Sequence, residues 1–321
     1  MSDKKPAANE LRIQRVFRAP VDLVWKAWTE LDHVHQWWGP RGFTLTTHHK
    51  ELRPGGTWKY TMHGPDGTDY PNITLYHEVE KHARLVYDHG ATENTPPLFR
   101  VRVNFKEVNG QTHMDMTMTL ESAEAAERIK GFIRQAGGNS TWDRLAEHID
   151  HQVTGQQRFV INRTFAASIE QVFKLWTEPE HLSRWLPPQG FTMQYRRAEI
   201  RPGGVCVYSM ANADRSVIMY GRCLYHEITP PTRIVYIQEF CDADEKLSSH
   251  PALPNWPASM KTIITLVAEA ADSTRVSVEW EPGPDSTPEE VRAFVEHRSG
   301  MTMGWTGSFN KLDEVIGREG F

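Results

Sequence analysis

Residues 15–44 read RVFRAPVDLVWKAWTELDHVHQWWGPRGFT, and residues 163–192 read RTFAASIEQVFKLWTEPEHLSRWLPPQGFT. Fourteen of these thirty positions are identical at a constant offset of 148 residues. The register extends, with one slip of a single residue, to two further matches: ELRPGG (51–56) with EIRPGG (199–204), and LYHEV (75–79) with LYHEI (224–228). A period of about 150 residues is far longer than the roughly 20–50 residues of stacked repeat arrays. The sequence therefore predicts one domain that occurs twice.

The length of the chain agrees with two domains, because 321 residues correspond to two units of roughly 100–200 residues. We expect a polar N-terminal tail at 1–10, a first domain at 11–151, a linker at 152–158 and a second domain at 159–317. The polar, glycine-containing stretch HQVTGQQ at 151–157 indicates the linker.

Each half shows the same order of predicted elements. An alternating segment at 11–17 predicts a first strand, and Val24 and Trp28 recur at helical spacing in the first of two short helices. Alternating segments bounded by turn residues predict six more strands, and a helical pattern at 125–149 closes the first half. This order predicts an α+β fold, in which a curved antiparallel sheet wraps round a long C-terminal helix.

Composition argues against several classes of function. The 36 Lys and Arg nearly balance the 41 Asp and Glu, so the chain lacks the basic surplus of a nucleic-acid binder. No apolar run approaches the roughly 20 residues that span a bilayer, so no integral membrane association is expected. The polar start MSDKKPAANELR does not resemble a signal peptide, and the odd number of three cysteines indicates free thiols. A cytoplasmic protein is expected.

Common catalytic and metal-binding signatures are absent from the sequence. It contains no G-x-S-x-G, phosphate-binding loop, H-E-x-x-H or G-x-G-x-x-G motif. The pairs His33-x-His35 and His48-His49 come without a matching carboxylate or cysteine set, so surface histidines are expected there. We therefore expect no metal and no cofactor, and no catalytic residue is assigned.

The inward faces of the predicted strands carry the candidate ligand contacts. Trp58, Tyr60 and Met62 alternate along 57–63 and therefore share one face. Methionine adapts to irregular ligands, and a buried tyrosine hydroxyl requires a partner that a ligand can supply. The candidate ligand-binding residues are Trp58, Tyr60, Met62, His77, Met116, Met118, Tyr208, Met210, His226 and Trp280. Simple filling of the core is the alternative for each of them.

The repeated LYHE motif places His77 and His226 beside apolar neighbours. If each strand alternates regularly, His77 shares a face with Leu75 and Val79. Such a histidine is either a hydrogen-bonded core residue, the polar anchor of a pocket, or a general base. The residue pattern leaves these three interpretations open.

Taken together, these motifs resemble a known family. The combination V-W-x-A-W-T-E, W-W-G-P-x-G-F-T and E-L-R-P-G-G-x-W is similar to START-like (SRPBCC, helix-grip) proteins. Within them it is most similar to the AHSA-type domain, named after the activator of a heat-shock-protein ATPase. The resemblance covers nearly the whole chain, twice, and implies a ligand cavity between each sheet and its C-terminal helix. It also implies that Gly137-Gly138 interrupts the lid helix, either as a gate or as a simple kink.

The second copy departs from the family pattern at two places. Trp38 of the first copy corresponds to Leu186 in the second. A proline-rich insertion at 242–257 separates two predicted strands and is expected to alter the mouth of the second cavity.

Two of the functions that the resemblance implies do not involve catalysis. The first is the binding of a small hydrophobic ligand (aromatic, acyl or lipid-like), with the first domain favoured for a stacking ligand because Trp58 becomes Cys206 in the second. The other is a co-chaperone-like module that stimulates a heat-shock ATPase, which a large exposed apolar patch would favour. A homodimer also stays open.

The remaining alternative is an enzyme of the cyclase, aromatase or hydrolase kind. His77, Tyr60 and either Arg100 or Arg102 would then orient the substrate and move protons. A buried His–Tyr or His–carboxylate pair that faces the cavity would favour this alternative.

Overall fold

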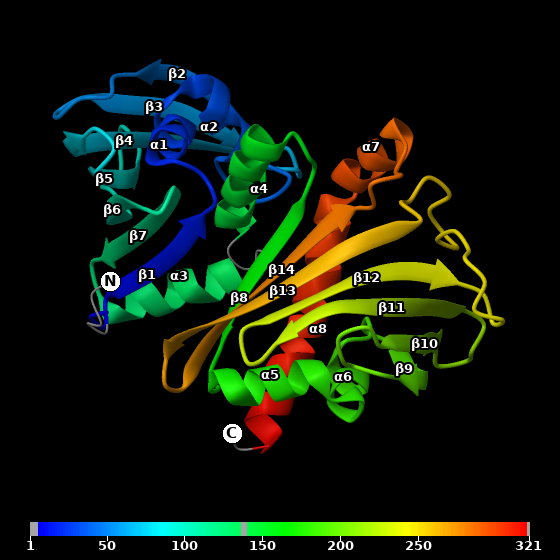
Figure 1. Ribbon diagram of the computed structural model, residues 1–321. Helices are drawn as coiled ribbons and strands as arrows, with labels where there is room; N and C mark the ends of the chain where they lie inside the picture. The colour runs from blue at the N-terminus through cyan, green and yellow to red at the C-terminus, as the bar shows by residue number, and fades with distance from the viewer. Residues whose placement is uncertain (1–5, 136–139, 320–321) are drawn as a thin grey trace. The chain divides into compact units, whose positions relative to one another are not determined.

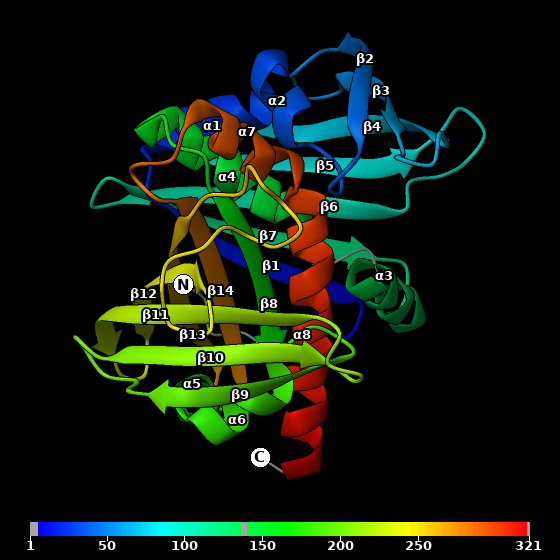
Figure 2. The same cartoon turned by 90° about the vertical axis from the view of Figure 1, so that its right-hand side faces the viewer.

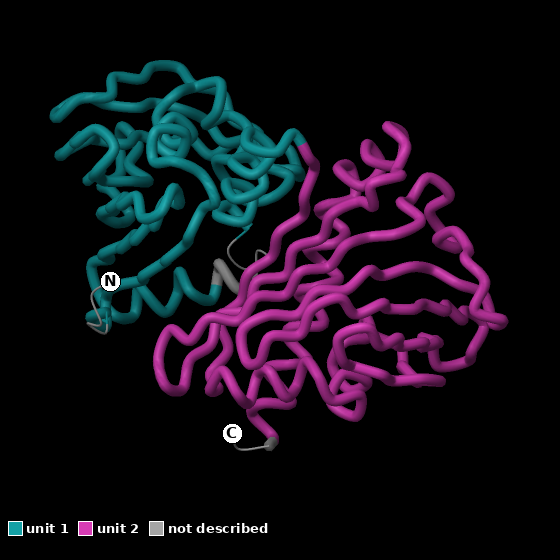
Figure 3. The backbone as a smooth tube through the Cα atoms, in the orientation of Figure 1, with its two compact units in different colours: residues 1–155 teal, residues 156–321 magenta. Residues whose placement is uncertain are grey.

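The computed structural model of the protein describes residues 6–135 and 140–319. The chain divides into two compact units, residues 1–155 and residues 156–321 (Figure 3). This division lies within the stretch 152–158 expected as a linker, although residues 152–154 form the end of a helix. Residues 1–5 of the expected tail lie outside the described part.

The first unit contains a seven-stranded antiparallel sheet with strand order β1-β7-β6-β5-β4-β3-β2 (Figure 1). Its described elements are β1 (Glu10–Phe17), α1 (Val21–Thr29), α2 (Leu31–Trp37), β2 (Thr44–Lys50), β3 (Thr57–His63), β4 (Asp69–Glu80), β5 (Arg84–Ala91), β6 (Phe99–Val108), β7 (Gln111–Leu120), α3 (Ala123–Gln135) and α4 (Ser140–Thr154).

The second unit repeats this topology in the order β8-β14-β13-β12-β11-β10-β9. Its described elements are β8 (Phe159–Phe165), α5 (Ile169–Thr177), α6 (Pro179–Trp185), β9 (Phe191–Ala198), β10 (Val205–Asn212), β11 (Ile218–Thr229), β12 (Arg233–Cys241), β13 (Ser259–Ala270), β14 (Ser273–Pro282), α7 (Pro288–Glu296) and α8 (Arg298–Glu319). In Figure 2, α8 runs alongside β8 and the strands β9 to β11 cross it, so the sheet curls round this helix.

The α+β fold with two short helices after the first strand is confirmed in both units. The helical segment expected at 125–149 is described as α3 and α4, on either side of residues 136–139. The second unit closes with α7 followed by the 22-residue α8. Gly137 and Gly138, predicted as a gate or kink, lie outside the described residues.

Local sequence signals explain where the helices of the second unit begin. The Ser168 hydroxyl accepts a hydrogen bond from the backbone N–H of Gln171, whose side chain accepts one from the Ser168 N–H in return. This reciprocal capping box starts α5. Helix α6 begins at Pro179, where the ring fixes a helical φ and no backbone N–H is needed.

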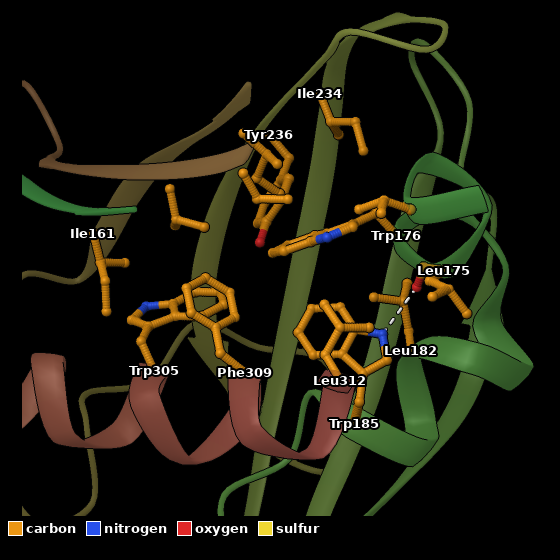
Figure 4. Packing of buried hydrophobic residues seen from close by; sticks show 14 of the residues in the cluster. Ile161, Leu175, Trp176, Leu182, Trp185, Ile234, Tyr236, Trp305, Phe309 and Leu312 are labelled. Carbon is orange, nitrogen blue, oxygen red and sulfur yellow. Dashed lines mark hydrogen bonds between the residues drawn. The ribbon is translucent and has the colours of Figure 1, made fainter. Parts of the chain in front are cut away.

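Two repeated tryptophans anchor the two cores in the same way. The indole Nε1 of Trp37 donates to the backbone oxygen of Ala27 at 2.7 Å, and that of Trp185 donates to Leu175 at 2.9 Å (Figure 4). Both indoles are completely buried, so each N–H requires an internal acceptor. Figure 4 also shows the α8 side chains that point into the second core: Trp305, Phe309 and Leu312.

The repeated RPGG motif makes the same tight turn in both units. A Cβ atom at Gly56 would lie 2.3 Å from the backbone oxygen of Glu51, and one at Gly204 would lie 2.1 Å from that of Glu199. Only glycine fits such a close approach of two backbone segments. The adjacent exposed ion pairs are Glu51–Arg53 and Glu199–Arg201.

Candidate functional site

The aromatic and methionine candidates of the first unit face the core. Trp58 and Tyr60 of β3 are each only 1% exposed, and Met116 and Met118 of β7 are buried in the same core. Met62 is partly buried and packs against the same core. Their burial is compatible with core packing as well as with contact to a ligand, so their role in binding stays a prediction.

The corresponding candidates of the second unit are also directed inward. Tyr208 is buried, whereas Met210 and Trp280 are partly buried and pack against the second core. Burial alone does not distinguish a ligand contact from core packing, so their role in binding stays a prediction.

The inward placement predicted for His77 and His226 is wrong. Both lie on the outer face of their strands, and Tyr76 and Tyr225 take the buried positions. Leu75 shares the face of His77 and is itself 37% exposed, so this apolar neighbour does not mark an inward face. The register also shifts between Tyr76 and Glu78 in β4 and between Tyr225 and Glu227 in β11. These shifts interrupt the alternation, so Val79, which packs against the core, does not share the face of His77.

His77 belongs instead to a polar cluster on the outer face. Its Nε2 lies 2.8 Å from Asp88, which also accepts a hydrogen bond from Arg100 at 2.7 Å. Arg100 and then His77 lower the pKa of the Asp88 carboxyl. Because Tyr60 faces the core and both Arg100 and Arg102 are exposed, the catalytic set of His77, Tyr60 and an arginine is not assembled.

A different histidine, His89, contacts Tyr60, and the sequence analysis did not identify it. Nδ1 of His89 on β5 lies 3.3 Å from the Tyr60 hydroxyl oxygen, which accepts a hydrogen bond from the Trp38 indole at 3.2 Å. His89 pairs across the sheet with Phe99, and their rings stack with centroids 4.9 Å apart. We call the group Trp38, Tyr60, His89 and Phe99 the His89 site.

Burial controls the ionisation of the His89 site. It lowers the pKa of His89 to about 4 and raises the pKa of the Tyr60 hydroxyl. Both groups are therefore neutral at pH 7. His89 and Phe99 nevertheless stay partly exposed, unlike Tyr60 behind them.

The second unit has a corresponding hydrogen bond to its buried tyrosine, but the partner is an amide and not an imidazole. Tyr208 corresponds to Tyr60, and Gln238 takes the place of His89. The Gln238 amide donates to the Tyr208 hydroxyl oxygen at 3.3 Å. Leu186 stands where the first unit has the indole donor Trp38, and Met260 pairs with Gln238 as Phe99 pairs with His89.

The insertion of the second unit packs aromatic side chains against its own core. Trp256 is 5% exposed and belongs to the core, with its ring centroid 5.8 Å from that of Phe294 in α7. His250 of the insertion packs against Phe240, which follows Gln238 on the inward face of β12. The insertion thus adds aromatic side chains to the second core, and its effect on the mouth of a cavity stays a prediction.

Lys50 is a further half-buried group that the sequence analysis did not identify. Its Nζ lies 4.5 Å from the centroid of the Trp58 ring and donates to the backbone oxygen of Thr29 at 2.9 Å. Burial lowers the pKa of Lys50 to about 8. The corresponding residue in the second unit is Ala198.

The described residues contain no group of three or more His, Cys, Asp or Glu side chains that could hold a metal ion. Within the same part of the chain, no helix is long and apolar enough to cross a membrane. The three cysteines are buried free thiols: Cys206, Cys223 and Cys241.

The fold defines the class of the protein as a START-like, helix-grip protein with two tandem units. The model of the family described as Activator of Hsp90 ATPase homolog 1-like protein matches residues 18–150 and 166–317. The chain belongs to this family.

Several solved structures are similar to the chain. A protein from Chromobacterium violaceum is 24% identical over 50% of this chain and 96% of its own, with a TM-score of 0.39. One from Nitrosomonas europaea is 22% identical over 46% and 99%, with a TM-score of 0.42. The di-domain ARO/CYC BexL from the BE-7585A biosynthetic pathway is 14% identical over 95% and 97%, with a TM-score of 0.39. No curated protein matches the chain.

Proposed function

We propose that the first unit binds a small hydrophobic ligand at the His89 site. The ligand packs against the exposed edge of Phe99, and His89 supplies the polar contact. The observation that carries the proposal is the hydrogen bond of 3.3 Å between Tyr60 and His89, directly behind a partly exposed aromatic pair. Pockets for small molecules combine apolar walls with a few fixed polar groups of this kind.

The proposed position lies at the end of the sheet and not deep behind it. Trp58 and Tyr60 fill the interior, so a ligand there would have to displace large buried rings. Contact with Phe99 and His89 needs no such displacement. A phenyl-sized ligand that buries about 150 Å² of apolar surface gains about 4 kcal/mol before the cost of association.

The second unit is proposed to hold no ligand at its corresponding position. Its own Trp256 and Phe240 cover the end of the sheet, and Met260, the counterpart of Phe99, is 2% exposed. One ligand per chain follows from this difference between the units.

An enzyme is the second candidate function, and the buried Tyr60–His89 pair is the observation that favours it. Proton transfer at neutral pH works best with a group whose pKa lies near 7. Burial lowers the pKa of His89 to about 4, so His89 is a weak base under these conditions. Binding without turnover is therefore the better supported of the two functions.

A co-chaperone role and a homodimer stay predictions. The family name refers to an Hsp90 ATPase, but that activity belongs to the protein after which the family is named. Co-purification of this chain with Hsp90 would test the first, and sedimentation of the purified chain would test the second.

Methionine methyl groups offer a direct test of the proposed ligand position. Met118 of β7 is a diagonal neighbour of Phe99, because their respective partners in the β6–β7 pair are Val101 and Leu120. Met260 occupies the place of Phe99 in the second unit. In the full chain labelled with ¹³C-methyl methionine, addition of ethylbenzene is expected to shift the Met118 signal and leave that of Met260 unchanged.

Two neighbouring variants supply the matched control for this experiment. Phe99→Ala removes the packing surface and is expected to weaken ethylbenzene binding at least about tenfold. Leu98→Ala alters a 59% exposed side chain that lies over Gly90, and is expected to leave binding unchanged. If the Met118 signal does not move in the wild type, or moves equally in Phe99→Ala, the proposed site is wrong.

A further inference from the structure

The hydrogen bonds of the His89 site form a chain in which Trp38 donates to Tyr60 and Tyr60 donates to His89. The Trp38 indole N–H can only donate, so the Tyr60 oxygen is the acceptor in their contact of 3.2 Å. The Tyr60 hydroxyl keeps its own proton, because burial raises its pKa. This buried proton requires an acceptor.

Nδ1 of His89 is the acceptor that the Tyr60 proton can reach, at 3.3 Å. The buried Thr74 hydroxyl also approaches Tyr60, but it lies outside hydrogen-bonding geometry. If His89 instead carried its proton on Nδ1, the Tyr60 oxygen would accept hydrogen bonds from both Trp38 and His89. The Tyr60 proton would then stay buried without an acceptor.

The direction of the hydrogen bond from Tyr60 to Nδ1 determines the tautomer of His89. A neutral imidazole carries one proton, and an accepting Nδ1 leaves that proton on Nε2. His89 is neutral at pH 7, because burial lowers its pKa to about 4. In the described part of the chain, Nε2 has no hydrogen-bond partner, and the His89 side chain is partly exposed.

We propose that the His89 site selects ligands with a carbonyl oxygen, which accepts a hydrogen bond from Nε2–H of His89 while the apolar body packs on Phe99. This inference rests on the proposed function and names the chemical class of its ligand: an aromatic or otherwise apolar ketone, aldehyde or ester. A ligand that offers only a hydrogen-bond donor forms no hydrogen bond with Nε2–H and therefore binds more weakly.

In the second unit, which lacks an indole at the position of Trp38, the hydrogen bond has the opposite direction. Leu186 replaces this indole, and there the Gln238 amide donates to Tyr208 at 3.3 Å, the reverse of the direction in the first unit. In the variant His89→Gln, Trp38 remains, so the glutamine oxygen must accept from Tyr60 and its NH₂ group is free to donate to the ligand. His89→Gln is therefore a conservative variant that retains the donor.

The test compares acetophenone with ethylbenzene, which share a phenyl ring and a two-carbon side chain and differ in the carbonyl oxygen. The measured quantity is the ratio of their dissociation constants for the full chain, so that their different hydrophobicities cancel between variants. In His89→Phe, which removes the donor and keeps a ring, the preference for acetophenone is expected to fall about 3- to 10-fold. In His89→Gln most of the preference is expected to remain.

A second measurement reads the tautomer without any ligand. The ¹⁵N spectrum of the wild-type imidazoles, assigned with His89→Gln, is expected to show His89 protonated on Nε2. Tyr60→Phe removes the hydroxyl that donates to Nδ1 of His89, and a mixture of tautomers is expected. A wild-type His89 protonated on Nδ1, or an unchanged preference in His89→Phe, would overturn the inference. If neither compound binds the wild type, the proposed function itself fails.

Discussion

The indole ring of Trp256 lies with its centroid 5.8 Å from the ring of Phe294, which joins the inserted segment of the second unit to helix α7. In the same unit Met260 is 2% exposed, whereas its counterpart Phe99 in the first unit is partly exposed. Two copies of one fold thus differ in access to the same position. Under the proposed function, this difference leaves the first unit as the binding unit and the second as its closed counterpart.

Shortening Trp256 is expected to open the second unit. Trp256→Leu removes the ring that contacts Phe294, so a second molecule of acetophenone should bind per chain. The loss of buried surface should lower the free energy of unfolding of this unit by about 1–3 kcal/mol. Ligand-detected NMR gives the stoichiometry, and urea unfolding gives the stability.

Leu247→Ala is the control for this experiment. Leu247 lies in the same insertion but is 60% exposed, so its truncation should change neither quantity. A folded Trp256→Leu protein that still binds a single ligand would contradict the closure of the second unit by Trp256.

The outer histidines are expected to be dispensable for binding. His77→Ala removes one partner of Asp88 and leaves the Arg100 contact of 2.7 Å in place. Its effect on the free energy of unfolding should stay within about 1 kcal/mol, as for other exposed ion pairs. Acetophenone affinity, measured by NMR titration, should equal that of the wild type, and a marked loss would place His77 at the binding site after all.

The burial of His89 predicts that the stability of the first unit falls at acidic pH. The pKa of His89 is about 4 in the folded chain and 6.5 in the unfolded chain, so the unfolded chain binds more protons between these values. Stability should therefore fall as the pH drops from about 6.5 to about 4, by an amount on the order of 1–3 kcal/mol. His89→Gln should lose this part of the pH dependence, and His77→Gln should keep it, when urea unfolding is compared across this range.

The lowered pKa of Lys50 predicts that the free energy of unfolding of the first unit changes at alkaline pH. Its pKa is about 8 in the folded chain against 10.5 when unfolded, so between these values the unfolded chain holds more protons. This group makes the first unit more stable as the pH rises through that window. Lys50→Met should abolish the rise and stabilise the protein by about 1–2 kcal/mol at pH 7. The exposed Lys59→Met should do neither; equal curves for Lys50→Met and wild type would show that Lys50 is solvated.

Repetition made the fold predictable from the sequence. Trp37 and Trp185 recur because each donates its indole N–H to a carbonyl of the preceding helix, and Gly56 recurs because a Cβ there would meet backbone. Constraints of this kind act within a short stretch of chain. They therefore leave a pattern that one sequence can reveal.

The candidate site was less predictable, because it depends on register and on distant partners. The apolar neighbour Leu75 placed His77 inside, but Leu75 is itself 37% exposed, and both residues lie on the outer face of β4. His89 meets Tyr60 from 29 positions away, across strands that a local pattern cannot align. One signal was available: a polar residue, His89 or Gln238, stands at the same inward position of both copies.

The number of ligands per chain tests the account most directly. Equilibrium dialysis of the full chain against saturating radiolabelled acetophenone counts bound molecules without any assumption about their position. The account predicts one per chain in the wild type and in Leu98→Ala, and clearly less than one in Phe99→Ala at the same concentration. Two molecules in the wild type, none at all, or one retained in Phe99→Ala would contradict it.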